Sequence, residues 1–167
     1  MKISIVSSAA LRRVSALAVK TLKEKSATVA TAESCTGGLI AKSITDIAGS
    51  SAVIAGGMVT YTNRIKTDVL GVDPAIIEQH TEVSHACAKA MAERAKAVFG
   101  TDYALSATGY ASPGGGTEQD PTGTVYIGIA TPNGARSERI TVENATRTQV
   151  RNTVAYYALT MLLNKIQ

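Results

Sequence analysis

The most informative stretch of the chain is residues 31–66, which read TAESCTGGLIAKSITDIAGSSAVIAGGMVTYTNRIK. It begins in a short predicted strand that contains β-branched residues, continues through a small polar turn at 33–38, and continues into a predicted helix. A Gly-Ser-Ser turn follows at 49–51, and a second strand ends on Tyr61. The stretch places a carboxylate, hydroxyls, a tyrosine and Lys66 at element ends, where side chains converge. Burial does not call for polar residues there, so they indicate a functional site.

The rest of the chain continues the same alternation of elements. Periodicity and capping residues predict helices at 8–25, 37–47, after Asn63, after 73–74, at 84–99 and after Asn144, and strands at 28–32, 53–61, 102–107, 124–131 and 136–142. The turn Pro132-Asn133-Gly134 predicts a hairpin between the last two strands. We therefore expect a three-layer α/β/α sandwich, whose mixed, mostly parallel sheet has about five strands, one of them antiparallel.

Bulk composition narrows the classes of function. A chain of 167 residues with 45% hydrophobic and 18% charged residues predicts one globular domain over 1–167. The net charge of +4 is modest and scattered, and aromatic residues make up only 4%, so we expect a small anionic substrate rather than a nucleic acid. No apolar run reaches about 18 residues, so no membrane span is expected and the cytoplasm is the default. A homo-oligomer stays open.

Several motifs in the chain carry a family resemblance. They are Ala-Glu-Ser-Cys-Thr-Gly-Gly at 32–38, Asp-Ile-Ala-Gly-Ser-Ser at 46–51, Val-Thr-Tyr-Thr-Asn at 59–63 with Lys66, and shorter matches at 70–72, 83–84, 112–116 and 121–125. Together they resemble the CinA family, and in particular its C-terminal domain of the nicotinamide-nucleotide amidohydrolase type. The likeness covers roughly residues 8–165 and implies the stand-alone form of that domain.

The resemblance implies a reaction and its catalytic residues. The expected reaction converts nicotinamide mononucleotide and water to nicotinate mononucleotide and ammonia, without a metal or organic cofactor. Ser51 is expected to be the nucleophile and Lys66 its base, with Tyr61 relaying a proton or orienting the lysine and Thr108 as a further active-site hydroxyl. A serine needs such a base, and a lysine serves only when it is held neutral. From spacing alone, Ser51 and Lys66 also fit a helix-ending turn and a solvated helix.

A second group of residues is expected to bind the substrate. The turn at 33–38 precedes a helix N-terminus, so its backbone N–H groups can hold an anion such as the substrate's phosphate. It matches neither phosphate-binding motif of ATP and dinucleotide sites, and a tight packing turn is the alternative. The expected substrate-binding residues are Glu33, Ser34, Thr36, Gly37, Gly38, Gly109, Gly114, Gly115 and Arg147. For Arg147, a solvated helix position is equally open.

The glycine-rich segment 108–116 departs from the resemblance. Tyr110 and Ser112 stand where the family pattern has isoleucine and glycine, and Thr122 stands where valine is usual. A bulky ring and a lost glycine beside the pocket would alter substrate fit. A nucleotide-binding module with weak or no catalysis is therefore the main alternative to an enzyme.

The cysteines and histidines carry weaker signals. Cys35 precedes a predicted helix, where a thiolate is favoured, so a cysteine enzyme is a further alternative. Cys87 shares an apolar helical face and is expected to be buried. His80 and His85 lack partners at metal-ligand spacing, so no metal is expected.

Overall fold

Five strands form one sheet in the order β2-β1-β3-β4-β5, in a computed structural model that describes residues 1–111 and 113–166. The strands are β1 (Val29–Glu33), β2 (Ile54–Val59), β3 (Tyr103–Gly109), β4 (Thr124–Thr131) and β5 (Gly134–Thr141). β1 pairs in parallel with β2 and β3, whereas β4 pairs antiparallel with both β3 and β5. Only β4 therefore runs against the others, as the sequence predicts.

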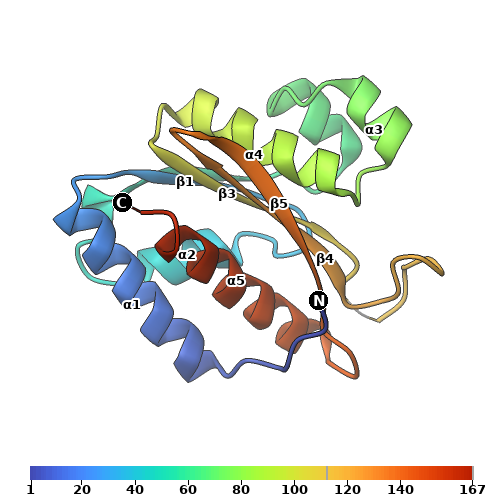
Figure 1. Ribbon diagram of the computed structural model, residues 1–167, viewed down its shortest axis with the longest axis horizontal. Coiled ribbons are helices and arrows are strands. Elements are labelled where there is room, and N and C mark those ends of the chain that lie inside the picture. Colours follow the sequence, from blue (N-terminus) through green and yellow to red (C-terminus); the bar gives the residue numbers. More distant parts are fainter. Residues whose placement is uncertain (112, 167) are drawn as a thin grey trace.

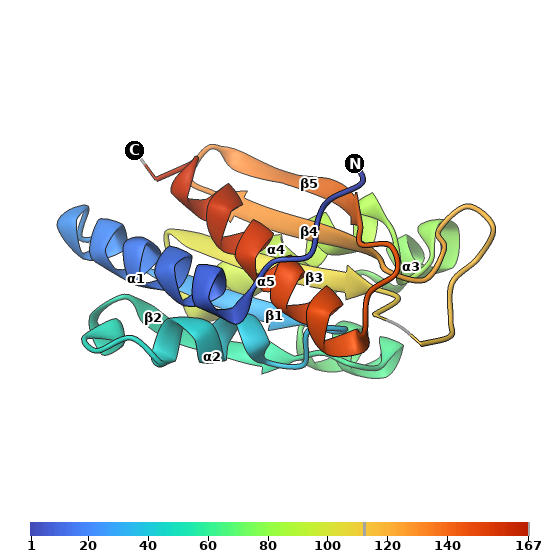
Figure 2. The same ribbon diagram turned by 90° about the horizontal axis from the view of Figure 1, so that it is seen from below.

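Helices cover both faces of this sheet (Figure 1). They are α1 (Ser8–Glu24), α2 (Leu39–Thr45), α3 (Pro74–His80), α4 (His85–Phe99) and α5 (Arg147–Leu163). α4 packs on one face, and α3 packs against α4. α2 and α5 cover the other face and α1 packs on both of them, so the three-layer sandwich is confirmed (Figure 2).

The α4 face is built for close approach of helix to sheet. Ser106 on β3 donates to the carbonyl oxygen of Ala88 on α4 over 2.5 Å. A Cβ at Gly128 on β4 would collide with that same carbonyl and with the Ser106 hydroxyl. Alanines such as Ala92 and Ala104 fill most of the remaining contact. Small residues thus bring α4 close to the sheet, and the connection that precedes α4 supplies Glu82 and Val83 to the site described below.

Two local features differ from the sequence expectation. The last helix is capped by Thr146 rather than Asn144. The Thr146 hydroxyl accepts from the Gln149 N–H, and Gln149 Oε1 accepts from the Thr146 N–H, so the two residues form a capping box. Asn144 instead lies in the preceding loop with φ 52°. The helix expected after Asn63 is a π-helical turn, Ile65–Val69. Such turns often mark functional sites.

The carboxyl ends of three strands meet at one edge of the sheet. In the parallel register, Glu33 at the end of β1 lies beside Val59 on β2 and Ala107 on β3. The glycine-rich segment after β3 and the N-terminus of α5 reach the same edge (Figure 2). In open α/β sheets, ligands bind at this edge.

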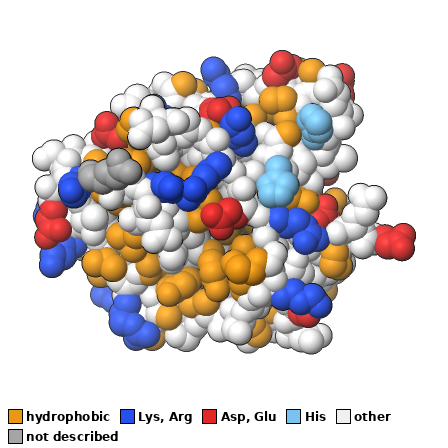
Figure 3. All heavy atoms as spheres, in the orientation of Figure 1, with side chains coloured by type: hydrophobic (Ala, Val, Ile, Leu, Met, Phe, Trp, Pro, Cys, Tyr) orange, Lys and Arg blue, Asp and Glu red, His pale blue; other side chains and the backbone are white. Residues whose placement is uncertain are grey.

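Basic side chains do not gather in one patch on the face drawn in Figure 3, whereas hydrophobic side chains gather over its central and lower part. On the face that Figure 3 shows, lysine and arginine side chains are dispersed among neutral and acidic ones. Among the described residues, no helix has both the length and the apolar character needed to cross a bilayer.

Candidate active site

Lys66 is a buried lysine at the carboxyl edge of the sheet. Its side chain comes from the π-helical turn and is only 1% exposed. Nζ donates to the carbonyl oxygens of Thr60 at 3.0 Å and Tyr61 at 3.4 Å, the two residues that follow β2. Burial lowers the pKa of Lys66 from the usual lysine value, although Cys87, Glu82 and Cys35 oppose the shift. The neutral amine is thus favoured more than in an ordinary lysine.

Ser34 is the hydroxyl that faces this amine. Its Oγ lies 3.3 Å from Lys66 Nζ. Ser34 directly follows β1, and its N–H donates to the carbonyl of Ala107 on β3, which fixes its position between two strands. A neutral amine has two N–H donors and one lone pair. When the two donors go to Thr60 and Tyr61, the lone pair is left for the Ser34 hydroxyl proton, which is the geometry of a serine and its general base.

The expected pairing of Ser51 with Lys66 is wrong. Ser51 is exposed and lies in a 3₁₀ turn, Ser50–Ala52, which precedes β2. Lys66 lies beyond the opposite end of that six-residue strand, which spans about 20 Å. The serine beside the lysine is Ser34, for which the sequence suggested only a role in binding.

A pocket of about 410 Å³ opens over Ser34 and Lys66. Its lining also includes Cys35, Tyr61, Thr62, Asn63, Glu82, Val83, Thr108, Gly109, Tyr110, Ala111, Gly114 and Arg147. A larger hollow of about 840 Å³ lies on the other side of Arg147, lined mainly by residues 142–147. Neither Ser34 nor Lys66 reaches that hollow, so the smaller pocket is the candidate site.

Arg147 and Tyr61 form one side of this pocket. Arg147 is the first residue of α5, and its Nη1 donates to the carbonyl of Ala111 at 3.2 Å. Its Nη2 donates to the Tyr61 hydroxyl at 3.1 Å. Tyr61 therefore contacts Lys66 through its carbonyl, whereas its phenol group pairs with the arginine. The guanidinium is the cation that the pocket offers to an anionic group of a ligand.

In the turn expected to bind an anion, a carboxylate of the protein already occupies the backbone donors. The fully buried Glu33 carboxylate accepts from the N–H groups of Ile40 at 3.0 Å and Ala41 at 2.8 Å, in the first turn of α2. These are the donors that an anion at the helix N-terminus would need. Glu33 is thus a helix cap that shapes the turn after Ser34, and its expected role in substrate binding is wrong.

The remaining residues of that turn also face away from the pocket. Arg151 donates from Nε and Nη2 to the carbonyl of Thr36, at 3.0 and 2.6 Å. Gly37 lies against the same guanidinium, and Gly38 lies against Val59. Thr36, Gly37 and Gly38 are absent from the pocket lining, which includes Ser34 and Cys35 of this turn. Their expected substrate contacts are therefore wrong, and Arg151 is the clamp that sequence analysis missed.

Cys35 does not have the properties of a nucleophile. It lines the pocket but is 5% exposed, and burial raises the pKa of its thiol to about 12. Burial also raises the pKa of the Cys87 thiol to about 11. A thiol that stays protonated at neutral pH attacks poorly, so the cysteine alternative is not supported. Cys87 is buried on α4, as expected.

Thr108 and other residues of the glycine-rich segment also line the pocket. The Thr108 hydroxyl lines the pocket and donates to the carbonyl of Glu82 at 2.6 Å. Gly109, Tyr110 and Gly114 also line it, whereas Gly115 is outside the lining and lies close to the Tyr110 ring. Ser112, the other departure from the family pattern, lies outside the described residues.

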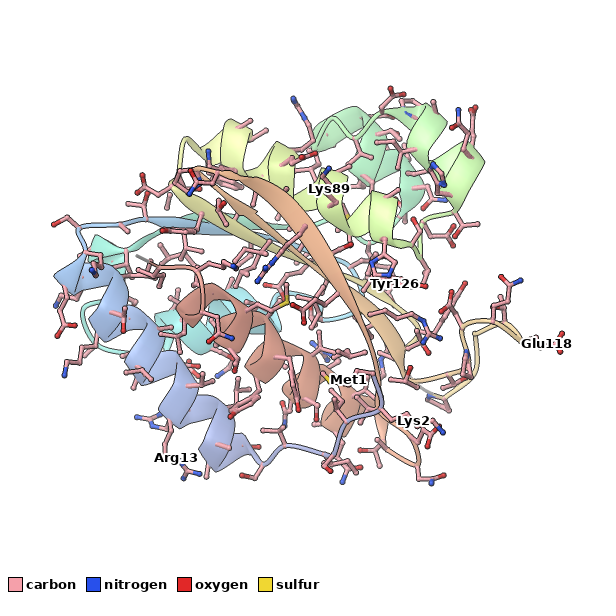
Figure 4. The ribbon with its side chains drawn as sticks, viewed as in Figure 1. Met1, Lys2, Arg13, Lys89, Glu118 and Tyr126 are labelled. Atoms are coloured by element: carbon pink, nitrogen blue, oxygen red, sulfur yellow. The ribbon has the colours of Figure 1, made fainter. Side chains whose placement is uncertain are left out.

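A partly buried ion pair anchors the glycine-rich segment to the sheet. Asp120 accepts from Arg139 Nε on β5 at 2.7 Å and from the Tyr126 hydroxyl on β4 at 3.0 Å. Arg139 Nη2 also donates to the carbonyl of Gln119, and Thr122 Oγ1 donates to the carbonyl of Gly115. Figure 4 shows Tyr126 beside the base of this segment and Glu118 at its outer tip.

The histidines do not contribute to this pocket. The ring of His85 packs edge-on against Tyr126, and its Nδ1 lies 2.8 Å from Ser137 Oγ. His80 is exposed at the end of α3. The described residues contain no group of three or more His, Cys, Asp or Glu side chains placed to hold a metal ion.

Comparison with known proteins agrees with the motifs. The profile described as "CinA C-terminal domain" matches residues 11–166. The chain belongs to the CinA family. A CinA-like protein of Myxococcus xanthus is 48% identical over 148 residues, which are 88% of this chain and 35% of the relative. A CinA-like protein of Synechocystis sp. is 52% identical over 116 residues, 70% of this chain and 28% of the relative. This CinA chain thus spans about a third of the length of these curated relatives.

Solved structures of the CinA family share the whole architecture. The competence/damage inducible protein CihA from Agrobacterium tumefaciens superposes with a TM-score of 0.91 at 36% identity, over 95% of this chain and 96% of that chain. The competence damage-inducible protein A from Klebsiella pneumoniae subsp. pneumoniae gives a TM-score of 0.88 at 30% identity, over 93% and 96% of the two chains. These comparisons establish family and fold.

Proposed function

We propose that this CinA-family chain is a serine amidohydrolase that removes ammonia from the carboxamide of nicotinamide mononucleotide. The observation that carries the proposal is the 3.3 Å contact between Ser34 Oγ and the buried amine of Lys66. A nucleophile in reach of a base whose pKa is lowered is the arrangement that acyl transfer requires. The choice of substrate rests on the family resemblance and on the cationic Arg147 in the pocket.

The first half-reaction makes an ester on Ser34. Neutral Lys66 takes the hydroxyl proton as Ser34 Oγ attacks the amide carbon. The C–N bond then breaks, and the protonated lysine gives its proton to the departing nitrogen, which leaves as ammonia. In this scheme the oxyanion is stabilised by the backbone N–H of Cys35, which follows Ser34 and lines the pocket beside it.

The second half-reaction hydrolyses the ester and regenerates the free enzyme. Lys66 removes a proton from water, and the resulting hydroxide attacks the ester carbon. Nicotinate mononucleotide leaves as the C–O bond to Ser34 breaks, and Ser34 Oγ regains the proton from Lys66. In this scheme Arg147, held by Tyr61 and Ala111, binds the phosphate and so keeps the reacting carbonyl carbon in place through both half-reactions.

The direct test is to incubate the purified chain with nicotinamide mononucleotide and to measure both ammonia and nicotinate mononucleotide. Equal amounts of the two products are expected, with kcat/KM rising with pH through a pKa below that of free lysine. A folded protein that releases neither product would overturn the proposal.

A binding module is the second candidate, because Tyr110 lines the pocket where the family pattern has a smaller apolar residue. Under that alternative, calorimetry detects nucleotide binding without ammonia release. The substitution Tyr110→Ile together with Ser112→Gly then distinguishes the two: for an enzyme restricted by its own segment, we expect kcat/KM to increase about tenfold.

A further inference from the structure

Glu82 is a carboxylate in the pocket that neither the fold nor the proposed reaction uses. It lies between α3 and α4 and lines the pocket with Lys66 and Tyr110. Within the described part of the chain, its carboxylate has no ion pair and no hydrogen bond, although five other acidic residues have them with basic partners.

The backbone at Glu82 is nevertheless fixed. Its carbonyl accepts from Thr108 Oγ1 at 2.6 Å, a bond from the end of β3 to this connection. On either side, Thr81 Oγ1 donates to the carbonyl of Val83, and Ser84 Oγ donates to the carbonyl of Thr81 while it caps α4. A charged side chain on a fixed backbone, directed to a pocket and left unpaired, is more typical of ligand binding than of folding.

The pocket therefore has charges of opposite sign from the two helical layers. Arg147 comes from α5, on one face of the sheet, and Glu82 comes from the α4 side, on the other. Burial is the largest cause of the raised pKa of Tyr110, and the negative charge of Glu82 raises it further. The same charge opposes the lowering of the Lys66 pKa.

We propose that Glu82 makes the pocket selective for a carboxamide carried on a positively charged ring, with the ring toward Glu82 and the anionic group toward Arg147. This inference rests on the proposed function for the carboxamide, and it adds the charge of the ring as the feature that is recognised. A zwitterionic ligand neutralises both protein charges at once, whereas a ligand with a neutral ring leaves Glu82 unpaired.

A cationic ring bound beside Glu82 also affects the protonation of Lys66, the proposed base. Glu82 stabilises the protonated form of Lys66, which is the wrong form for a base. A positive ring beside Glu82 screens that effect and disfavours a second positive charge on Lys66. The substrate itself thus favours the neutral form of Lys66, which accepts the proton of the Ser34 hydroxyl.

The test compares two ligands that differ in ring charge but share the phosphate. Nicotinamide mononucleotide has a cationic ring, and its reduced dihydro form has a neutral one. Calorimetry on the Ser34→Ala chain measures binding without turnover. We expect the cationic form to bind more tightly, and Glu82→Gln in the same background to reduce that preference at least about fivefold.

Glu78→Gln is the matched control, because Glu78 is exposed on α3, outside the pocket lining, and carries the same charge. It should leave the preference unchanged. An unchanged preference in Glu82→Gln, an equal weakening of both ligands, or no binding of either ligand would each overturn the inference. Ammonia release by the unsubstituted chain is measured separately. If ammonia is absent but the preference depends on Glu82, the proposed function fails and this subsite stands.

Discussion

Arg139 Nε donates to Asp120 Oδ1 across 2.7 Å, and this ion pair joins β5 to the segment that carries Gly114 and Gly115. Both side chains are partly buried, at 32% and 18% exposure, and Tyr126 adds a hydrogen bond to the same carboxylate. The pair thus fixes one wall of the pocket to the sheet, although none of the three residues lines the pocket.

The first prediction concerns this anchor. Arg139→Met should lower the free energy of unfolding by about 1–3 kcal/mol, since it leaves a partly buried carboxylate with fewer partners. It should also raise KM more than it lowers kcat, because the wall moves and the dyad does not. Urea unfolding and steady-state kinetics measure the two effects.

Lys2 and Glu143 provide the control, since their 2.7 Å pair is exposed. Glu143→Gln should change stability by less than about 1 kcal/mol. A larger loss in the control than in Arg139→Met would contradict this account of the anchor.

The second prediction concerns Thr122, one of the departures from the family pattern. Its hydroxyl donates to the carbonyl of Gly115 at 2.6 Å, which closes the base of the glycine-rich segment. Thr122→Val keeps the shape and removes the bond, so residues 113–120 should exchange amide hydrogens faster. Thr131→Val removes a similar bond to the carbonyl of Gly134 in the β4–β5 hairpin and should leave that segment protected. Equal protection in both variants would refute the role of Thr122.

The third prediction concerns Glu33. Its two carboxylate oxygens accept from Ile40 and Ala41. Glu33→Gln places an NH₂ group against one of these N–H donors, so we expect a loss of about 2–3 kcal/mol in the free energy of unfolding. Asp102→Asn is the exposed comparison: Asp102 also accepts from a backbone N–H, at Thr28. It should cost less, and a larger cost at Asp102 would be inconsistent with the buried cap.

The fourth prediction concerns Lys66 and pH. Burial lowers its pKa in the folded chain, whereas the unfolded chain titrates it at about 10.4. Between these values the unfolded chain binds more protons, so this lysine destabilises the fold at low pH, and its cost disappears as pH rises. Lys66→Met should therefore be more stable than the parent near neutral pH, with a difference that shrinks toward pH 10.4.

Urea unfolding of both proteins from pH 7 to about 10.5 measures this difference. Cys35 and Cys87 have raised pKa values and titrate in the unfolded chain over part of that range. Burial, the largest cause of both thiol shifts, is present in both proteins, whereas the smaller opposing effect of Lys66 on the thiol pKa values is present only in the parent. A difference that stays constant over the whole range would show that Lys66 has an ordinary pKa.

The sequence predicts the layers, the sheet and most of the pocket, because they depend on local periodicity and on strand ends. The sequence singles out Tyr61 and Lys66 because they follow a strand, and the family resemblance supplies the roles expected of Lys66 and Thr108. The error at Ser51 has a topological cause. In a parallel β-α-β unit, the connection from strand to helix lies at the carboxyl edge, and the connection from helix to strand lies at the amino edge. Ser34 is in the first and Ser51 in the second, so topology alone could have separated them.

Other features depend on contacts that no local pattern contains. Asp120 and Arg139 meet across a hairpin and a loop, and Arg151 reaches Thr36 from the other end of the chain. Glu33 looked like a ligand because a carboxylate stood in a polar turn. Its role as a cap depends on the direction in which α2 leaves that turn.

The central claim is that Ser34, and not Ser51, attacks the carboxamide with Lys66 as its base. The most direct measurement is ammonia release from nicotinamide mononucleotide by Ser34→Ala and Ser51→Ala, with folding of both checked by circular dichroism. The account predicts a loss of at least about 1,000-fold in kcat for Ser34→Ala and near-parental activity for Ser51→Ala. Full activity in Ser34→Ala together with its loss in Ser51→Ala would contradict it.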